Sequence, residues 1–286
     1  MKNTLVLIAP SLDDATVQRA SEILWSNRGE VGTPDWLAPG IACEIPFDGK
    51  ATTMSLPGVD AVIVASANRR KRLLVADMES TMIKNEMLDE LADFLGLRDR
   101  IAAITARAMN GELDFAAALN ERVGLLKGLP VSKLDEAARR IRYMPGGATL
   151  VATMKKHGAT CALVSGGFTY FTGLVRKALG FDLDAANVLK HDGQTLAGAV
   201  ELPILGKEAK LATLERLCAE RSLHVGEALT VGDGANDLPM LKAAGLGVAF
   251  HAKPVVAAEV SARIDHGDLT ALLYLQGYRK SDFVEA

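Results

Sequence analysis

Short apolar runs alternate with longer amphipathic stretches along most of this chain. Three of the runs, at residues 73–76, 162–164 and 228–231, are almost entirely apolar, so both faces of each would be buried. Runs of this kind are typical of parallel strands, and the helical patterns between them supply the crossovers that parallel pairing requires. The pattern therefore predicts an α/β fold with a doubly wound parallel sheet that begins near residue 73.

The segment from about residue 84 to 144 departs from this alternation. Its apolar residues recur at helical spacing, and no strand pattern interrupts them. The expected helices cover residues 87–95, 98–109, 112–126 and 132–142. An all-helical insertion after the first core strand predicts a helical cap that lies over the ends of the strands.

Residues 1–68 carry a pattern of their own. The expected strands are 4–9, 41–47 and 60–64, and the expected helix is 13–27. This indicates a small N-terminal α+β domain, in which the sequence shows no cluster of chemically active side chains. The basic run 69–72 is expected to be a solvated linker, and residues 69–286 then form the second domain.

Composition narrows the class of protein but not its function. Hydrophobic residues make up 49% and charged residues 23% of the chain, which is ordinary for a soluble globular protein. The net charge of −3 gives no general attraction to nucleic acid, and no apolar run approaches the roughly 18 residues of a membrane span. Cys43, Cys161 and Cys218 form no closely spaced pair, which favours a reducing compartment. We therefore expect a cytoplasmic protein.

Acidic residues directly follow two of the predicted buried strands. Asp77 and Glu79 come after the first, and Asp233 and Asp237 come after the last. The carboxyl ends of neighbouring parallel strands meet at one edge of a sheet, so these side chains are expected to converge. A lone aspartate in either place is more often a helix cap or part of a surface turn. Converging carboxylates, in contrast, favour a hard cation such as Mg²⁺ and a phosphoryl group.

Two further features are expected at the same edge. Ser165-Gly166-Gly167 is expected to end the middle strand and precede a helix over 168–179, whose N-terminal amides would suit a phosphate. Lys210 lies early in an expected helix over 206–220. Alone, the first feature is a tight turn as often as a phosphate site, and a single lysine is usually solvated.

Taken together, these motifs resemble the four motifs of the haloacid dehalogenase-like (HAD) phosphatases, and more narrowly those of the phosphoserine phosphatases. The motifs are Asp77-Met78-Glu79-Ser80-Thr81, Ser165-Gly166-Gly167, Lys210 and Gly232-Asp233-Gly234-Ala235-Asn236-Asp237. They occur in order over about residues 69–266. The resemblance implies a HAD-like, Rossmann-like sheet with an inserted cap, and Mg²⁺ as the cofactor.

The resemblance also implies a role for each acidic residue. Asp77 would be the nucleophile that becomes an aspartyl-phosphate, and Glu79 would protonate the departing oxygen and then activate water. Mg²⁺ would be held by the Asp77 carboxylate, the main-chain carbonyl of Glu79 and Asp233, with Asp237 supporting the site. By the same resemblance, the substrate-binding residues would be Glu86, Met109, Phe115, Arg122, Ser165, Gly166, Lys210 and Asn236. Without it, the cap residues among them would be expected to be ordinary helix packing or solvated surface.

One residue departs from the family pattern, which usually has aspartate at the position of Glu79. The additional methylene group moves the carboxyl group by roughly 1.5 Å, which is enough to disturb the geometry of proton transfer. A carboxyl group is still present, and the metal would be bound through the backbone. We therefore expect an active enzyme.

The resemblance implies a Mg²⁺-dependent phosphomonoester hydrolase that converts O-phospho-L-serine to serine and phosphate, the last step of serine synthesis. A related phosphotransferase that uses another acceptor, such as homoserine, would need the same residues, and a non-catalytic amino-acid sensor is a further alternative. Residues 1–68 resemble, by element order alone, the ACT-like domains attached to some phosphoserine phosphatases. A homodimer formed through this domain is an open alternative to a ligand-binding role. No nucleic-acid or membrane partner is expected.

Overall fold

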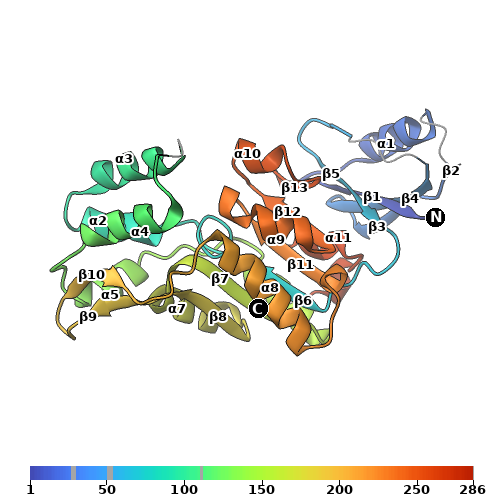
Figure 1. Ribbon diagram of the computed structural model, residues 1–286. Coiled ribbons are helices and arrows are strands. Elements are labelled where there is room, and N and C mark those ends of the chain that lie inside the picture. Colours follow the sequence, from blue (N-terminus) through green and yellow to red (C-terminus); the bar gives the residue numbers. More distant parts are fainter. Residues whose placement is uncertain (27–29, 50–53, 110–111, 286) are drawn as a thin grey trace.

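The computed structural model describes residues 1–26, 30–49, 54–109 and 112–285. Its main sheet has the strand order β13-β12-β11-β6-β7-β8, and its neighbouring strands pair in parallel (Figure 1). The strands are β6 (Leu73–Ala76), β7 (Thr160–Phe168), β8 (Leu183–Asn187), β11 (Ala228–Gly232), β12 (Leu246–Phe250) and β13 (Ala262–Ile264). The predicted α/β fold with a parallel sheet is confirmed, and β6 lies between β7 and β11, so the carboxyl ends of these strands are adjacent.

Helices cover both faces of this sheet because its strands are apolar on both faces. Leu73 and Val75 of β6 pack against α8 and α9, whereas Leu74 and Ala76 belong to the cluster that contains α6, α7 and α11. These helices are α6 (Gly147–Lys156), α7 (Thr169–Leu179), α8 (Lys207–Glu220), α9 (Leu238–Ala243) and α11 (Ala271–Leu275), and the short α10 spans Pro254–Ala257. The alternation along one short strand thus supplies two separate layers of core.

Helices also fill the chain between β6 and β7. They are α2 (Met87–Asp93), α3 (Arg98–Met109), α4 (Phe115–Gly124) and α5 (Ser132–Ala138). The two connections to the core run side by side, because the amide of Lys84 donates to the carbonyl of Arg142 at 2.8 Å. A hairpin of β9 (Leu189–His191) and β10 (Leu196–Val200) packs against this group. Figure 1 shows the inserted helices beside the core, on the side away from the N-terminal sheet.

The N-terminal residues form an antiparallel sheet of strand order β2-β4-β1-β5, in which β3 also pairs with β4. Its elements are β1 (Asn3–Ile8), α1 (Asp14–Ser26), β2 (Glu30–Val31), β3 (Asp35–Ala38), β4 (Ala42–Asp48) and β5 (Asp60–Ala65). Leu5 and Leu7 of β1 pack with α1, whereas Val6 and Ile8 belong to the large core cluster. The sheet therefore lies between α1 and the main domain. The sequence pattern missed β2 and β3, which are short and surrounded by glycine and proline.

Polar contacts fasten this sheet to the rest of the chain. The Arg69 guanidinium pairs with Glu44 at 2.6 Å and donates to the main-chain carbonyls of Tyr274 and Leu275. The Asp60 carboxylate accepts hydrogen bonds from the amides of residues 265, 266 and 267. The prediction of a solvated linker is wrong at Arg69, whose side chain is only 11% exposed. Its charge is satisfied by residues that are far away in the sequence, so the local pattern gave no sign of it.

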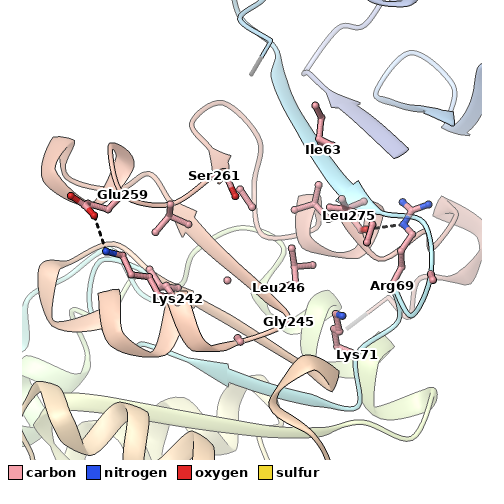
Figure 2. A pocket seen from close by; sticks show the side chains of 17 residues that line it. Ile63, Arg69, Lys71, Lys242, Gly245, Leu246, Glu259, Ser261 and Leu275 are labelled. Atoms are coloured by element: carbon pink, nitrogen blue, oxygen red, sulfur yellow. Dashed lines mark hydrogen bonds and ion pairs between the residues drawn. The ribbon is translucent and has the colours of Figure 1, made fainter. Parts of the chain in front are cut away.

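A cavity of about 360 Å³ lies at the junction of β5 with β12 and β13 (Figure 2). Leu246 and Ala262, the first residues of β12 and β13, help to line it, so it opens at the amino ends of these strands. Lys242 and Glu259 lie on its wall and form an ion pair at 2.7 Å.

Short 3₁₀ turns complete the chain at η1 (Val225–Glu227), η2 (Ala235–Asp237) and η3 (Lys280–Asp282). Within the described residues, no helix has the length and apolar character needed to cross a membrane.

Candidate active site

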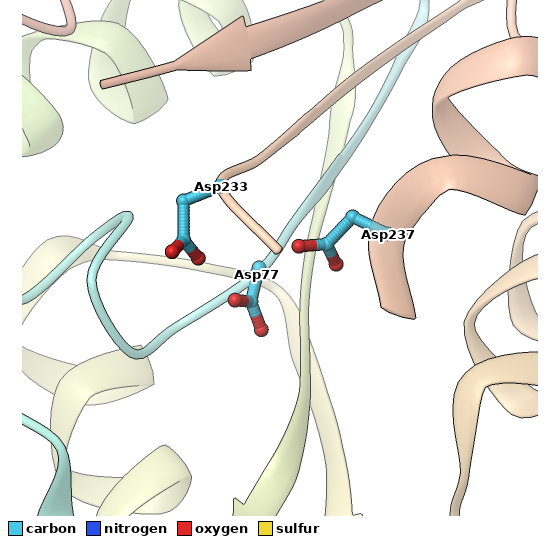
Figure 3. Close-up of side chains that lie close together, drawn as sticks. All are labelled: Asp77, Asp233 and Asp237. Atoms are coloured by element: carbon cyan, nitrogen blue, oxygen red, sulfur yellow. The ribbon is translucent and has the colours of Figure 1, made fainter. Parts of the chain in front are cut away.

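Carboxylates from separate segments meet at the carboxyl ends of β6 and β11. Asp77 follows β6, Asp233 follows β11 and Asp237 ends η2, and all are buried. Each offers an oxygen atom that lies within 4.8 Å of the oxygens of the other two (Figure 3). The amide of Asp77 donates to the carbonyl of Val231 at 3.0 Å, which continues the pairing of β6 with β11 up to the site. The convergence expected from the sequence is therefore present.

Glycine is required beside Asp237. A β-carbon at Gly232 would lie 2.4 Å from Cγ of Asp237, a distance that no folded protein accommodates. The amide of Gly234 donates to Oδ2 of Asp237 at 3.0 Å and fixes the carboxylate. A β-carbon at Gly234 would lie 2.5 Å from Oδ1 of Asn236, so this side chain also folds back over the turn. The glycines thus let the chain turn tightly enough to bring both aspartates to one point.

The ammonium group of Lys210 lies inside the acidic cluster. Its Nζ is 2.6 Å from Oδ1 of Asp77 and 2.5 Å from Oδ1 of Asp237, and its side chain is 1% exposed. Burial alone would lower the pKa of Lys210, but the charges of Asp77 and Asp237 more than offset this and raise it. Lys210 is therefore a permanently charged group, because a buried lysine is stable only with such partners.

Asp77 is subject to opposing influences. Burial raises its pKa to about 8, whereas the nearby Lys210 lowers it and the Asp237 charge raises it further. A divalent cation among these carboxylates would favour the ionised form that a nucleophile needs. Burial also raises the pKa of Asp233. The cluster thus has excess negative charge, and a cation would stabilise it.

Glu79 lies beside this cluster and faces a glycine. Its Oε1 accepts the amide of Met87, the first residue of α2, at 2.8 Å. Its Oε2 would lie 2.8 Å from a β-carbon at Gly167, so the longer side chain fits because residue 167 has none. Burial and the charge of Glu86 raise the pKa of Glu79 to about 8. The carboxyl group therefore holds a proton at neutral pH, as a general acid must.

Ser165, Gly166 and Gly167 are part of β7, which continues to Phe168. The predicted order is confirmed, since the three residues lie at the end of the strand and α7 begins at Thr169, one residue later than expected. The register of β7 with β8 shifts between Val164 and Phe168, which marks an irregularity at this point. The hydroxyl oxygen of Ser165 accepts the amide of Gly167 at 2.9 Å. The serine and glycines thus lie at an irregular strand end, directly before the N-terminus of α7.

Asn187 holds this segment in place, and the sequence did not reveal it. Its side-chain amide donates to the carbonyl of Gly166 at 2.9 Å, and its Oδ1 accepts the amide of Leu205 at 2.7 Å. Leu205 leads into α8, the helix that carries Lys210. Asn187 is the last residue of β8 and is buried. Polar residues at the carboxyl ends of parallel strands are expected to build the site, so Asn187 could have been predicted if the sequence had revealed β8 as a strand.

Side chains of the inserted helices reach the same region. Phe115, the first residue of α4, lies against two core segments: a β-carbon at Gly166 would be 3.1 Å from its ring, and one at Gly206 would be 3.3 Å away. Glu86 is the N-cap residue of α2 and accepts the hydroxyl of Ser80 at 2.7 Å. These contacts join the inserted helices to the loop after β6, to the end of β7 and to the start of α8.

Arg122 and Met109 complete the predicted set on the inserted helices. Nε of Arg122 donates to the carbonyl of Ala118 within α4 at 3.1 Å. Burial lowers its pKa, while the charges of Glu79 and Glu86 oppose this effect, so the guanidinium lies in an acidic environment. Met109 is the last residue of α3, and its side chain lies outside the described part of the structure.

Lys253 is a second cation at the site that the sequence did not reveal. Its Nζ lies 3.3 Å from Oδ2 of Asp233, and its amide donates to the carbonyl of Asp233 at 3.0 Å. It comes three residues after the end of β12, beyond the last of the motifs that the sequence singled out. The apolar run over 246–250 is a strand signal, and it could have pointed to this residue.

Residues 74–242, more than half of the chain, match the family model of the haloacid dehalogenase-like hydrolases. The chain belongs to this family. It is similar in structure to a HAD family hydrolase from Salmonella enterica serovar Typhi, with a TM-score of 0.83 and 30% identity over 96% of this chain and 98% of that one. A probable phosphoserine phosphatase from Vibrio cholerae has a TM-score of 0.81 and 29% identity, over 98% of this chain and 88% of that one.

Curated proteins with similar sequences are named phosphoserine phosphatases. A phosphoserine phosphatase from Streptomyces coelicolor is 39% identical over 254 residues, which cover 88% of this chain and 62% of that protein. A phosphoserine phosphatase from a Polaromonas species is 44% identical over 210 residues, which cover 71% of this chain and 89% of that protein. The chain spans less than two thirds of several of these relatives, including those from Streptomyces and Haemophilus influenzae.

Proposed function

We propose that this chain is a Mg²⁺-dependent phosphomonoester hydrolase that converts O-phospho-L-serine and water to L-serine and phosphate, the final step of serine synthesis. The observation that carries the proposal is the convergence of Asp77, Asp233 and Asp237 on the buried ammonium of Lys210. The Glu79 carboxyl group, whose pKa is raised to about 8, lies beside them. The relatives that share this chain's sequence are named phosphoserine phosphatases, which supports the choice of substrate. A cytoplasmic location is the matching prediction.

The acidic cluster fits a divalent cation. Buried carboxylate oxygens within 4.8 Å of one another are the hard ligands that Mg²⁺ prefers. Asp77, Asp233 and the main-chain carbonyl of Glu79 would hold the ion, and Asp237 would support it through the turn at Gly234. When bound, the cation would neutralise the cluster and favour the approach of a phosphate dianion.

The chain's own residues then divide the chemistry into two steps. The Asp77 carboxylate attacks phosphorus, the bond to the serine oxygen breaks, and Glu79 gives that oxygen its proton. In the second step Glu79 takes a proton from water, the water oxygen attacks the phosphorus of the aspartyl-phosphate, and Asp77 is released as a carboxylate. Ser165, Gly166, Lys210 and Asn236 would bind the phosphoryl oxygens through their hydroxyl, amide and ammonium groups.

We also propose that the inserted helices, within about residues 84–144, act as a cap. Glu86 would bind the substrate ammonium and Arg122 the substrate carboxylate, an arrangement that matches the charges of an amino-acid phosphate. Phe115 and Met109 would exclude water when the cap closes. The packing of Phe115 against Gly166 supports this role, because it places a cap side chain directly on the proposed phosphate-binding segment.

Residues 1–68 are proposed as a separate ACT-like domain, with 69–286 as the phosphatase domain. The order β2-β4-β1-β5, with α1 between the first two strands along the chain, supports this assignment because it is the order of a split βαβ sheet. No second helix occurs between β4 and β5 in the part of that segment that the structure describes. A homodimer formed through this domain remains a prediction.

Purified protein incubated with O-phospho-L-serine, with and without Mg²⁺, tests the proposal directly. We expect Mg²⁺-dependent release of phosphate from the wild-type protein and at least about a thousandfold less from Asp77→Asn, because the amide cannot act as the nucleophile. Equal release by both proteins, or none by either, would refute the proposed function.

A further inference from the structure

Lys253 is held in a fixed position beside the acidic cluster. Its own amide donates to the carbonyl of Asp233, and its carbonyl accepts the amides of Val256 and Ala257 of α10. His251, two residues before Lys253, is also anchored. Its amide donates to the carbonyl of Ile264, and its Nε2 forms a hydrogen bond with the carbonyl of Gly267. The backbone therefore aims the ammonium group at Asp233 and does not leave it free on a surface loop.

The two lysines of the site differ in burial and in the carboxylates with which they pair. Lys210 is buried and pairs with Asp77 and Asp237, whereas the Lys253 side chain is 52% exposed and pairs with Asp233. Burial lowers the pKa of Lys253, but Asp233 and then Glu86 more than offset this and raise it. Lys253 is thus a charged, half-exposed group that pairs with Asp233 of the core and whose pKa is also raised by the charge of Glu86 on the inserted helices.

Lys253 adds one positive charge to a site that is rich in carboxyl groups. Asp77, Asp233, Asp237 and Glu86 supply the carboxyl groups, and Lys210 and Lys253 supply two ammonium groups. Whatever the protonation of the carboxyl groups, removal of Lys253 makes the site more negative by one charge. The site without Lys253 would therefore attract a divalent cation more strongly and a phosphate dianion less strongly.

We propose that Lys253 is a positioning residue that sets the charge balance of this site: it weakens the hold of the cluster on Mg²⁺ and strengthens the attraction of the phosphate. The inference rests on the proposed function only for its second half. The first half concerns the binding of Mg²⁺ to the free protein and requires no substrate.

Calorimetric titration of the full chain with Mg²⁺, without substrate, tests the first half. Lys253→Met removes the charge but keeps the length of the side chain, and we expect it to bind Mg²⁺ about three- to tenfold more tightly than the wild-type protein. Lys253→Arg keeps the charge and should bind within about twofold of wild type. Lys242→Met is the matched control, because Lys242 is also 52% exposed and paired with a carboxylate but lies at the cavity near β5.

The kinetic consequence is a rise in KM with little change in kcat. At saturating Mg²⁺, Lys253→Met should raise KM for phosphoserine about three- to tenfold and change kcat less than about twofold. The differences from wild type in Mg²⁺ affinity and in KM should become smaller at roughly 0.5 M salt, because the half-exposed ammonium group of Lys253 is then screened. A lysine that only holds the loop would not give this dependence on salt.

The charge-balance role of Lys253 and the proposed phosphatase function can be refuted independently of each other. Tighter Mg²⁺ binding by Lys253→Met alone supports the inference even if phosphoserine is not hydrolysed, and in that case only the proposed function falls. Mg²⁺ binding by Lys253→Met that equals or is weaker than wild type overturns the inference. An equal gain in Lys242→Met also overturns it, because the effect would then be a general one of net charge.

Discussion

The carboxyl group of Glu79 lies directly against Gly167, where a β-carbon would stand 2.8 Å from its Oε2. The extra methylene of the glutamate is accommodated by the missing side chain opposite. Since Glu79 also accepts the amide of Met87, its position is set from two sides, by the strand end of β7 and by the first turn of α2. A glutamate can therefore occupy the place where the family usually has an aspartate.

Gly167→Ala should lower kcat in the wild-type background by about ten- to a hundredfold, because its methyl group displaces the Glu79 carboxyl group. With Glu79→Asp already present, the same change should cost less than about threefold, because the shorter side chain leaves room. A double-mutant cycle on kcat measures this coupling. Gly173→Ala is the control, since nothing lies within 4 Å of a β-carbon added there. Equal losses in both backgrounds would show that Glu79 and Gly167 act independently.

Glu79→Gln should reduce phosphate release by about a hundred- to ten-thousandfold, because the amide neither donates a carboxylic proton nor accepts one from water. Mg²⁺ binding should stay within about threefold of wild type, since the main-chain carbonyl of residue 79 is unchanged. Phosphate release and calorimetric Mg²⁺ titration separate the two effects. Near-normal turnover would exclude an acid-base role for this residue.

Lys210→Met should both inactivate and destabilise the protein. The variant leaves Asp77 and Asp237 buried without their cation, and breaking such a pair typically costs about 3 to 5 kcal/mol. Urea unfolding measures the loss, and added Mg²⁺ should restore part of it by supplying positive charge. Lys242→Met, at an exposed ion pair, should change the stability by less than about 1 kcal/mol. Similar losses in both variants would argue against a special role for the buried lysine.

Asp60→Ala should loosen the N-terminal sheet and leave the chemistry intact. The buried carboxylate accepts several amides of residues 265–267, and hydrogen bonds to a charged group contribute about 1.5 to 3 kcal/mol each to the stability. We expect faster proteolysis near residues 66–72 and kcat within about threefold of wild type. Asp48→Ala is the control, because its carboxylate accepts the exposed amide of Lys2, before β1, whereas Asp60 pairs with Ile8 at the other end of that strand. Unchanged proteolysis would contradict an anchoring role for Asp60.

The sequence predicted those parts of the site that depend on local pattern. Asp77 and Asp233 could be placed together because each directly follows a strand whose apolar character is evident, and parallel strands end at one edge. Asp237 could be added because it lies only four residues after Asp233. The helices between β6 and β7 were visible from their periodicity. The three residues after Val164 were expected to end a strand and precede a helix, but a tight turn stayed open, because two glycines look the same in a turn and in an irregular strand end.

The residues that the sequence missed depend on partners far away in the chain. Arg69 looked like part of a solvated basic run, yet it bonds to carbonyls of residues 274 and 275. Asn187 joins Gly166 to Leu205, and Lys253 pairs with Asp233. No periodicity or composition records such contacts, because each is defined only when the strands are in their order in the sheet.

The most direct test of the proposed mechanism is to trap the aspartyl-phosphate. Wild-type protein is mixed with ³²P-labelled phosphoserine and Mg²⁺, quenched in acid within milliseconds and digested, and the labelled peptide is identified by mass spectrometry. We predict a hydroxylamine-sensitive phosphate on Asp77 that is absent from Asp77→Asn. A label on another residue, or rapid phosphate release without any protein-bound label, would contradict the assignment of Asp77 as the nucleophile.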